Sequence, residues 1–91
     1  MEFEWDEDKA ATNQKKHKVT FPEAASVFGD ALSSTFPDPD HSVDEDRYIT
    51  IGTSDRGRVL IVSHTDRKGR IRIISARKAT PRERKVYEEE K

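Results

Sequence analysis

The stretch that decides the fold is RYITIGTSDRGRVLIVSHTDRKGRIRIISARK, residues 47–78. It contains three runs rich in β-branched residues: Arg47–Thr53, Arg58–Asp66 and Arg70–Lys78. Two short polar segments that include glycine separate these runs, which is typical of hairpin turns. The continuous apolar run within the middle segment, Val59–Val62, favours burial on both faces of a sheet. The pattern therefore predicts an antiparallel meander of three strands.

The residues on either side of this meander predict helices and one weaker strand. The first helix covers Asp6 to about His17, with acidic residues at its start and basic residues at its end. Capping boxes, in which a threonine and a glutamate satisfy the first turn together, start two more helices at Thr20 and Thr80. A weaker strand is expected over Ala31–Phe36. The chain is therefore expected to form one α+β domain, residues 1–91, with two N-terminal helices, a four-stranded antiparallel sheet and a C-terminal helix.

Length and composition narrow the possible functions. The chain has 91 residues, of which 38% are charged and 32% hydrophobic, and it has no cysteine. Disulfides, thiol nucleophiles and cysteine-ligated zinc are therefore excluded. No apolar run approaches the roughly 20 residues of a membrane helix, and the acidic start does not resemble a signal peptide. We expect a cytoplasmic protein without membrane association.

The net charge of −1 conceals a strong asymmetry between the two halves of the chain. Residues 1–46 hold four basic and twelve acidic side chains, whereas residues 47–91 hold thirteen basic and six acidic ones. Such asymmetry indicates a surface that binds polyanions. The alternative is that the acidic half packs beside the basic half and neutralises it.

Arginine is the most informative residue type in the basic half. Alternation along the last strand places Arg70, Arg72 and Ile74 on one face and Arg77, with Ile71, Ile73 and Ser75, on the other. Arg77 then shares its face with less polar residues, so it serves either as a buried ion-pair partner or as a phosphate ligand. Arginine suits the role of phosphate ligand because its planar guanidinium group binds phosphate through two hydrogen bonds.

A second cluster of polar residues surrounds His41. His41 titrates near neutrality and is a candidate general acid or base, and Glu45 is a candidate proton acceptor. The alternative is a polar loop whose aspartates cap local turns. The three histidines are scattered and no glycine-rich phosphate loop is present, so we expect no metal site and no cofactor.

The order and spacing of many residues resemble the BrnT family, the toxin component of bacterial type II toxin–antitoxin modules. The resemblance covers nearly the whole chain, and its most specific block is Arg72-Ile73-Ile74-Ser75-Ala76-Arg77. Earlier blocks that carry it include Glu4-Trp5-Asp6, Lys16-His17, Asp40-His41-Ser42 and Ile51-Gly52. The resemblance implies a RelE-like fold, a ribonuclease that blocks translation, and a cognate BrnA antitoxin that binds operator DNA.

The resemblance also turns the candidate residues into a hypothesis for RNA cleavage. The 2′-hydroxyl of the substrate would attack the adjacent phosphate without a metal ion. Arg67 and Arg77 would bind the phosphate, His41 or Glu45 would transfer protons, and three residues would hold the RNA backbone: Arg47, Arg72 and Lys78. The alternative is a non-catalytic module whose basic half binds nucleic acid or an acidic partner.

Overall fold

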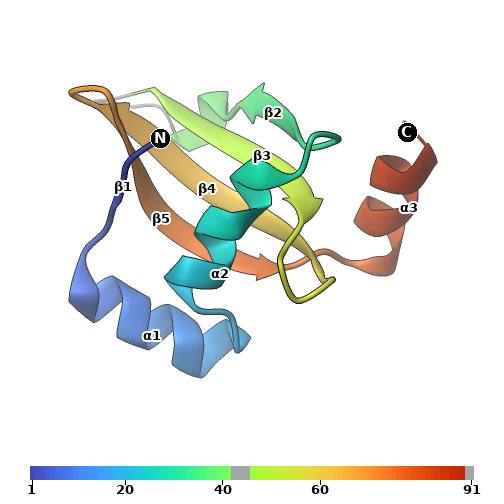
Figure 1. The fold of residues 1–91 in the computed structure, drawn as a ribbon, viewed down its shortest axis with the longest axis horizontal. Coiled ribbons are helices and arrows are strands. Elements are labelled where there is room, and N and C mark those ends of the chain that lie inside the picture. Colours follow the sequence, from blue (N-terminus) through green and yellow to red (C-terminus); the bar gives the residue numbers. More distant parts are fainter. Residues whose placement is uncertain (42–45, 90–91) are drawn as a thin grey trace.

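A computed structural model describes residues 1–41 and 46–89, the side chain of His41 excepted. Its centre is a five-stranded sheet in the order β1-β5-β4-β3-β2 (Figure 1). The strands are β1 (Phe3–Glu4), β2 (Ser34–Pro37), β3 (Arg47–Thr53), β4 (Val59–Arg67) and β5 (Arg70–Lys78). The helices are α1 (Glu7–His17), α2 (Phe21–Ser26) and α3 (Pro81–Glu89), with 3-10 turns η1 (Val27–Gly29) and η2 (Pro39–His41). None of the helices in the described ranges has the length and apolarity to cross a membrane.

The predicted meander β3-β4-β5 is confirmed, and the weaker strand is β2, which pairs antiparallel with β3. The prediction of a four-stranded, wholly antiparallel sheet is wrong. A fifth strand, β1, pairs in parallel with β5 and aligns Phe3 with Ile71 and Glu4 with Arg72. A strand of two residues is too short to show alternation, so the sequence pattern did not reveal it.

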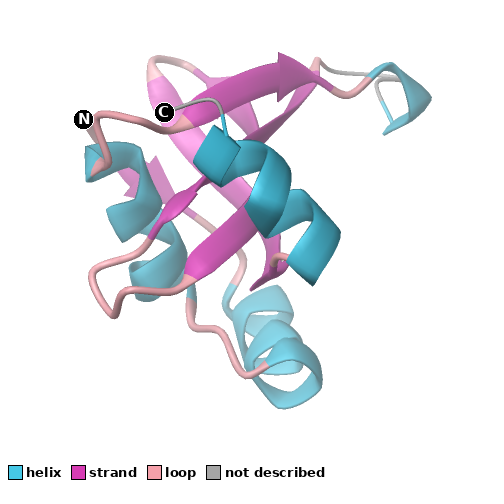
Figure 2. Ribbon diagram, turned by 90° about the vertical axis from the view of Figure 1, so that its right-hand side faces the viewer, coloured by secondary structure: helices cyan, strands magenta, loops and turns pink. Residues whose placement is uncertain are grey.

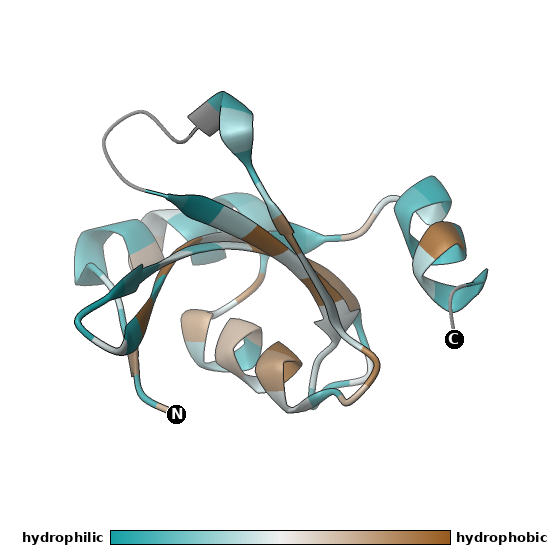
Figure 3. Ribbon diagram, turned by 90° about the horizontal axis from the view of Figure 1, so that it is seen from above, coloured by the Kyte–Doolittle hydropathy of each residue, from teal (hydrophilic) through white to brown (hydrophobic). Residues whose placement is uncertain are grey.

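Helix α2 lies against one face of the sheet, α1 lies along the edge of β5, and α3 lies beyond the end of β5 (Figures 1 and 2). The helix-covered face forms the core, and the segment from α2 to η1 is coloured mainly as apolar in Figure 3. The fully buried core residues are Val19, Phe21, Ala24, Val27, Leu60, Val62, Ile73 and Ala76. The opposite face, here called the open face, is covered by neither α1 nor α2.

The helix starts were predicted correctly, with one difference in detail. Thr80 and Glu83 form the complete capping box, because the Glu83 amide donates to Thr80 Oγ1 and the Thr80 amide donates to Glu83 Oε1. At α2 the Glu23 amide donates to Thr20 Oγ1, as expected. The Glu23 side chain, however, does not return to Thr20. Its carboxylate instead accepts hydrogen bonds from Arg58 and Ser54 of the β3–β4 hairpin.

Asn13 of α1 connects this helix to β5 through its buried side-chain amide. Asn13 Nδ2 donates to the carbonyls of Val19 at 3.0 Å and Ala76 at 2.8 Å, and Asn13 Oδ1 accepts from the Ala76 amide at 3.0 Å. The side chain thus satisfies both backbone groups of Ala76, as a neighbouring strand would. It completes the edge of β5 where β1 does not reach.

Gly52 lies where β3 and η1 approach each other closely. A Cβ atom at this position would lie 2.8 Å from Val27 Cγ1 and 2.9 Å from Ser33 Cβ. Gly52→Ala is therefore expected to lower the free energy of unfolding by about 1–3 kcal/mol, as in other overpacked cores. Gly29→Ala is the matched control, because a Cβ at Gly29 meets nothing within 4 Å. Urea denaturation of both variants tests this, and equal stability of the two would contradict the close approach.

His64 lies inside the core rather than at the surface. Its side chain stacks against Tyr48, meets Phe28 edge-on, and shares a 2.7 Å hydrogen bond between Nε2 and Thr50 Oγ1. Its Nδ1 atom is buried and has no hydrogen-bond partner among the described residues. Burial lowers the pKa of the His64 imidazole, although the charge of Asp66 partly opposes this. His64 is therefore a structural histidine whose burial disfavours the charged form.

The lowered pKa of His64 predicts that stability depends on pH. An unfolded histidine has a pKa near 6.5, so below about pH 6.5 the unfolded state binds a proton more readily than the folded state. The free energy of unfolding should therefore fall as the pH drops from about 6.5 toward the folded pKa. Urea denaturation between pH 5 and 8 tests this. His64→Leu should flatten that segment of the profile, and an unchanged profile would rule out His64 as its source.

Candidate functional site

One irregularity in β5 decides which arginines lie on the open face. The β4–β5 register skips Ile74, which is an extra residue, a β-bulge. Alternation changes phase at this residue, so Ile73 and Ala76 both belong to the core although they are three residues apart. Arg72 and Arg77 consequently share the open face. The prediction that they occupy opposite faces is wrong, because it assumed uninterrupted alternation.

At one end of the open face, polar side chains form a row across four strands. Thr65 of β4 pairs with Arg47 on one side and Arg72 on the other, and Arg72 pairs in turn with Glu4. Thr65 is 2% exposed and its hydroxyl donates to the carbonyl of Asp46. Two of the predicted RNA-binding arginines therefore flank a fixed, buried threonine.

The β4–β5 hairpin adds two more arginines to this end of the open face. Its two-residue turn, Lys68-Gly69, has positive φ angles of 52° and 79°, and it aligns Arg67 with Arg70. A surface hollow of about 430 Å³ results, here called the Arg67 pocket. Its lining residues are Glu4, Arg67, Lys68, Arg70 and Arg72.

Within the Arg67 pocket, two arginines are paired and one is not. A guanidinium nitrogen of Arg72 lies 2.8 Å from Glu4 Oε2, and Arg70 Nε lies 3.2 Å from Glu2 Oε2. Arg67 has no ion-pair partner among the described residues and is exposed. Its guanidinium is thus available for an external anion, while the neighbouring carboxylates hold Arg70 and Arg72 in place.

Arg77 lies at the other end of the open face. It pairs across the strands with Ile61, which is six residues from Arg67 along β4, a separation of about 20 Å. The structure therefore does not bring the two predicted phosphate ligands together. Glu83 of α3 binds the Arg77 guanidinium through two hydrogen bonds, of 2.8 and 3.0 Å.

The Arg77–Glu83 pair is a bidentate ion pair near the surface. The Arg77 guanidinium, more than the Thr80 amide, lowers the pKa of the Glu83 carboxyl to about 2. The same contact raises the pKa of Arg77. Arg77 thus forms an ion pair, but not the buried pair that was one of its two predicted roles, because its side chain is 42% exposed.

The remaining predicted site residues lie elsewhere or outside the described part. Lys78 is exposed at the end of β5 and lines a different hollow, of about 460 Å³, together with Arg84 and Tyr87 of α3. His41 ends η2, and its side chain, like all of Glu45, lies outside the described residues. The segment that carries them leaves the sheet beside Arg47, whose carbonyl accepts from the Asp38 amide at 2.8 Å.

The sequence interpretation did not assign Thr65, Lys68 and Arg70 to the site. A usable signal existed, because a two-residue hairpin turn at Lys68-Gly69 places residues 67 and 70 opposite each other. Within the described side chains, no group of three or more His, Asp and Glu residues is arranged to hold a metal ion.

Comparison with known proteins identifies relatives of this arginine-rich fold. A solved structure, described as the Brucella abortus ribonuclease toxin BrnT, matches with a TM-score of 0.69 and 25% sequence identity. The match covers 88% of this chain and 97% of that one. A search of curated protein sequences found no significant match. Residues 5–83 match the family described as the ribonuclease toxin BrnT of type II toxin–antitoxin systems. With nearly its whole length matched, the chain belongs to the BrnT family of ribonuclease toxins.

Proposed function

We propose that this toxin cleaves RNA at the Arg67 end of the open face, using the 2′-hydroxyl of the substrate and no metal ion. One observation supports this most directly. Arg67 is an exposed arginine without an ion-pair partner among the described residues, in a hollow whose other arginines are held by carboxylates. Such a hollow suits a phosphate group better than any other part of the open face.

The proposed chemistry needs two proton transfers and compensation of charge on phosphorus. The 2′-oxygen loses a proton to a base and attacks the adjacent phosphorus. The bond to the 5′-oxygen then breaks, and an acid protonates that oxygen. Arg67 offsets the charge that builds up on the phosphate oxygens, and Arg47 and Arg72 hold the flanking backbone. His41 and Glu45, on the segment that leaves the sheet next to Arg47, are the proposed acid and base.

The decisive experiment is incubation of the purified toxin with RNA in excess EDTA. Metal-independent cleavage should leave fragments that end in a 2′,3′-cyclic phosphate, detectable by mass spectrometry. Cleavage that requires added Mg²⁺ would contradict the proposed mechanism. RNA that stays intact both with and without ribosomes would instead favour the alternative, a non-catalytic module that binds nucleic acid or an acidic partner through its basic half.

Arg77 is proposed as a more distant contact to the RNA backbone. Arg77→Ala should lower kcat/KM for RNA cleavage about tenfold, less than the loss of a charge-stabilising group at the reacting phosphate. Glu83→Gln is the comparison, because it breaks the ion pair but leaves Arg77 in place. If both variants lose the same activity, the pair acts by docking α3 and Arg77 does not contact RNA.

The family also implies a partner protein. We propose that a BrnA-like, DNA-binding antitoxin neutralises this toxin and that operator DNA binds through the complex. This proposal rests on membership of a type II toxin–antitoxin family. Co-expression with the adjacent open reading frame should restore growth and yield a complex that shifts operator DNA in a gel. Growth arrest that persists despite soluble partner protein would contradict it.

A further inference from the structure

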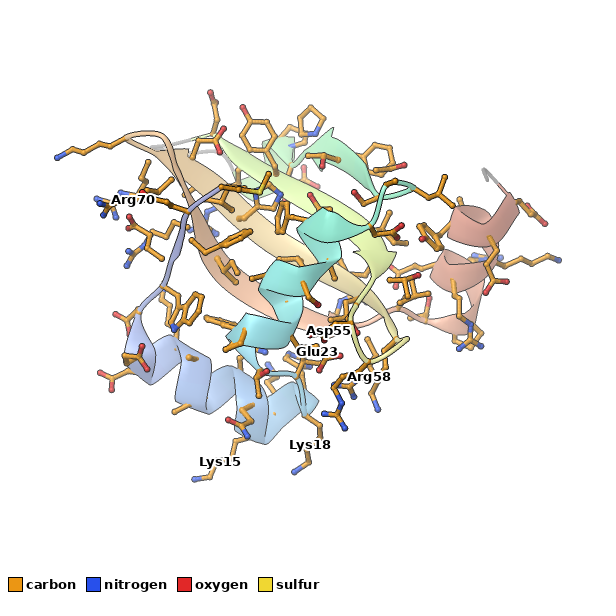
Figure 4. The ribbon with its side chains drawn as sticks, in the orientation of Figure 1. Lys15, Lys18, Glu23, Asp55, Arg58 and Arg70 are labelled. Carbon is orange, nitrogen blue, oxygen red and sulfur yellow. The ribbon has the colours of Figure 1, made fainter. Side chains whose placement is uncertain are left out.

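A second basic hollow lies far from the Arg67 pocket. It has a volume of about 560 Å³ and lies between α1, the turn that follows α1, and the β3–β4 hairpin. We call it the Lys18 pocket, and its lining residues are Ala11, Thr12, Gln14, Lys15, Lys18, Thr20 and Arg56. Figure 4 shows Lys15 and Lys18 at the lower edge of the molecule and Arg70 at the opposite corner. The two basic regions are therefore separate.

The charged residues that line the Lys18 pocket are all cations. They are Lys15, Lys18 and Arg56, and no carboxylate belongs to the lining. The buried acid beside it is Glu23, which is 4% exposed and 4.0 Å from Arg56 at its nearest, whereas Asp55, which precedes Arg56, is exposed and does not line the pocket. The pocket therefore presents a concentrated positive charge unless Glu23 offsets it.

Glu23 does not offset it, because Arg58 already neutralises this carboxylate. Glu23 Oε2 accepts from Arg58 Nε at 2.9 Å and from Ser54 Oγ at 2.7 Å, and Oε1 accepts from the second Arg58 nitrogen. These contacts, that with Arg58 first, lower the pKa of Glu23. Arg56 stays 69% exposed in its side chain. Three cationic charges thus remain for an external ligand.

Lys18 occupies a backbone position that ordinarily favours glycine. It ends α1 in the left-handed region, with φ 60° and ψ 32°, where a side chain is unfavourable. Its carbonyl accepts a hydrogen bond from Arg58 at 3.1 Å, which ties this turn to the hairpin. Lys15, in the last turn of α1, lines the same pocket. The backbone that carries the cationic side chains of the pocket is therefore held in place by the contact between the turn and the hairpin.

The lining also indicates the kind of ligand. Ala11 is its only apolar residue, and it has no aromatic side chain on which a base could stack. Thr12, Gln14 and Thr20 add hydroxyl and amide groups that bind phosphate oxygens. Such a lining suits a ligand that is recognised through its phosphates, without reading of base sequence. The pocket is open to the surface, so it admits a continuous strand.

We propose that the Lys18 pocket binds the phosphodiester backbone of the substrate RNA, beyond the segment cleaved on the open face. This inference rests on the proposed ribonuclease function. The molecule measures 32 × 26 × 25 Å, so a strand that joins the two basic regions spans roughly 30 Å. For a strand that keeps its bases stacked, with a rise of about 3.4 Å per nucleotide, this requires on the order of nine nucleotides. The pocket then makes binding depend on RNA length.

The test compares two triple variants that remove the same charge. The pocket variant removes all three cations of the pocket through Lys15→Gln, Lys18→Gln and Arg56→Gln. The control variant removes three exposed cations elsewhere through Lys9→Gln, Arg82→Gln and Lys85→Gln. Binding of 2′-O-methyl RNA of 6 and 20 nucleotides, which cannot be cleaved, is measured against salt. The pocket variant should bind the 20-mer at least about tenfold more weakly. The slope of log binding constant against log salt concentration should become shallower by about two, because each of the three lost phosphate contacts contributes about 0.7. Binding of the 2′-O-methyl 6-mer should not change, and neither should cleavage of an unmodified RNA 6-mer.

A single variant separates folding from binding. Lys18→Gly removes one cation and relieves the left-handed backbone, so it should raise the thermal midpoint and still weaken binding of the 20-mer. Equal 20-mer affinity of the pocket and control variants would overturn the proposal. Loss of pyrophosphate binding, measured by calorimetry, with unchanged 20-mer affinity would also overturn it and assign the pocket to a free phosphate. Absence of cleavage by the wild-type toxin would contradict the proposed function instead, because the 2′-O-methyl RNA titration does not depend on cleavage.

Discussion

Replacing Arg67 with alanine is expected to slow RNA cleavage about 100- to 1,000-fold, the usual loss when a group that stabilises transition-state charge is removed. Arg67 has no carboxylate partner among the described residues, so its removal frees no buried charge and should leave the fold intact. The effect should appear mainly in kcat. Single-turnover cleavage of a labelled RNA, together with thermal unfolding of the variant, measures both quantities.

Two further variants define what Arg67 contributes. Arg67→Lys keeps the charge but loses the two-pronged geometry, so its activity should lie between those of the wild type and Arg67→Ala. Arg82→Ala, an exposed arginine on α3, is the control and should cleave at the wild-type rate. If Arg67→Ala retained full activity in a folded protein, the reacting phosphate would have to lie elsewhere on the open face.

Asn13→Leu should be the most destabilising single substitution proposed for this chain. It removes three buried hydrogen bonds and leaves the amide and carbonyl of Ala76 without partners. Each buried, unsatisfied backbone group costs about 1–3 kcal/mol, so we expect a loss of about 3–5 kcal/mol. A domain of this size has about 5–14 kcal/mol in total, and the thermal midpoint should fall by at least about 10 °C.

Calorimetry of Asn13→Leu and of a neighbouring control tests this expectation. Gln14→Leu makes a similar change at an exposed position of the same helix and should shift the midpoint by no more than a few degrees. Equal midpoints for the two variants would show that the amide of Asn13 contributes little and that β5 satisfies Ala76 in another way.

The order of elements was predictable from the sequence because local signals determine it. The hairpin glycines, the apolar run Val59–Val62 and the threonine caps at positions 20 and 80 each act within a few residues. The features that were missed depend on distant contacts. The strand β1 exists because β5 offers it an edge, and Glu23 binds Arg58, 35 residues away, rather than its own helix start.

The candidate site was predictable in composition but not in arrangement. The arginine-rich strands and the two residues proposed as acid and base, His41 and Glu45, are visible in the sequence. Which arginines share a face was predicted incorrectly, because simple alternation was continued through the adjacent apolar pair Ile73-Ile74, where the extra residue lies. The break in alternation at this pair is visible in the sequence, but two adjacent apolar residues are equally typical of a strand that is buried on both faces. The distance of about 20 Å between the two arginines follows from register alone.

The bulge at Ile74 also bears on how BrnT sequences are compared with one another. Because of this extra residue, every later residue of β5 faces the side of the sheet opposite to the one that simple alternation from Arg70 would give. An alignment that moves a gap across Ile74 would preserve most amino-acid identities, yet it would assign Ala76 to solvent and Arg77 to the interior. Placement of insertions and deletions, more than the residue types themselves, therefore determines whether arginines in two relatives are equivalent.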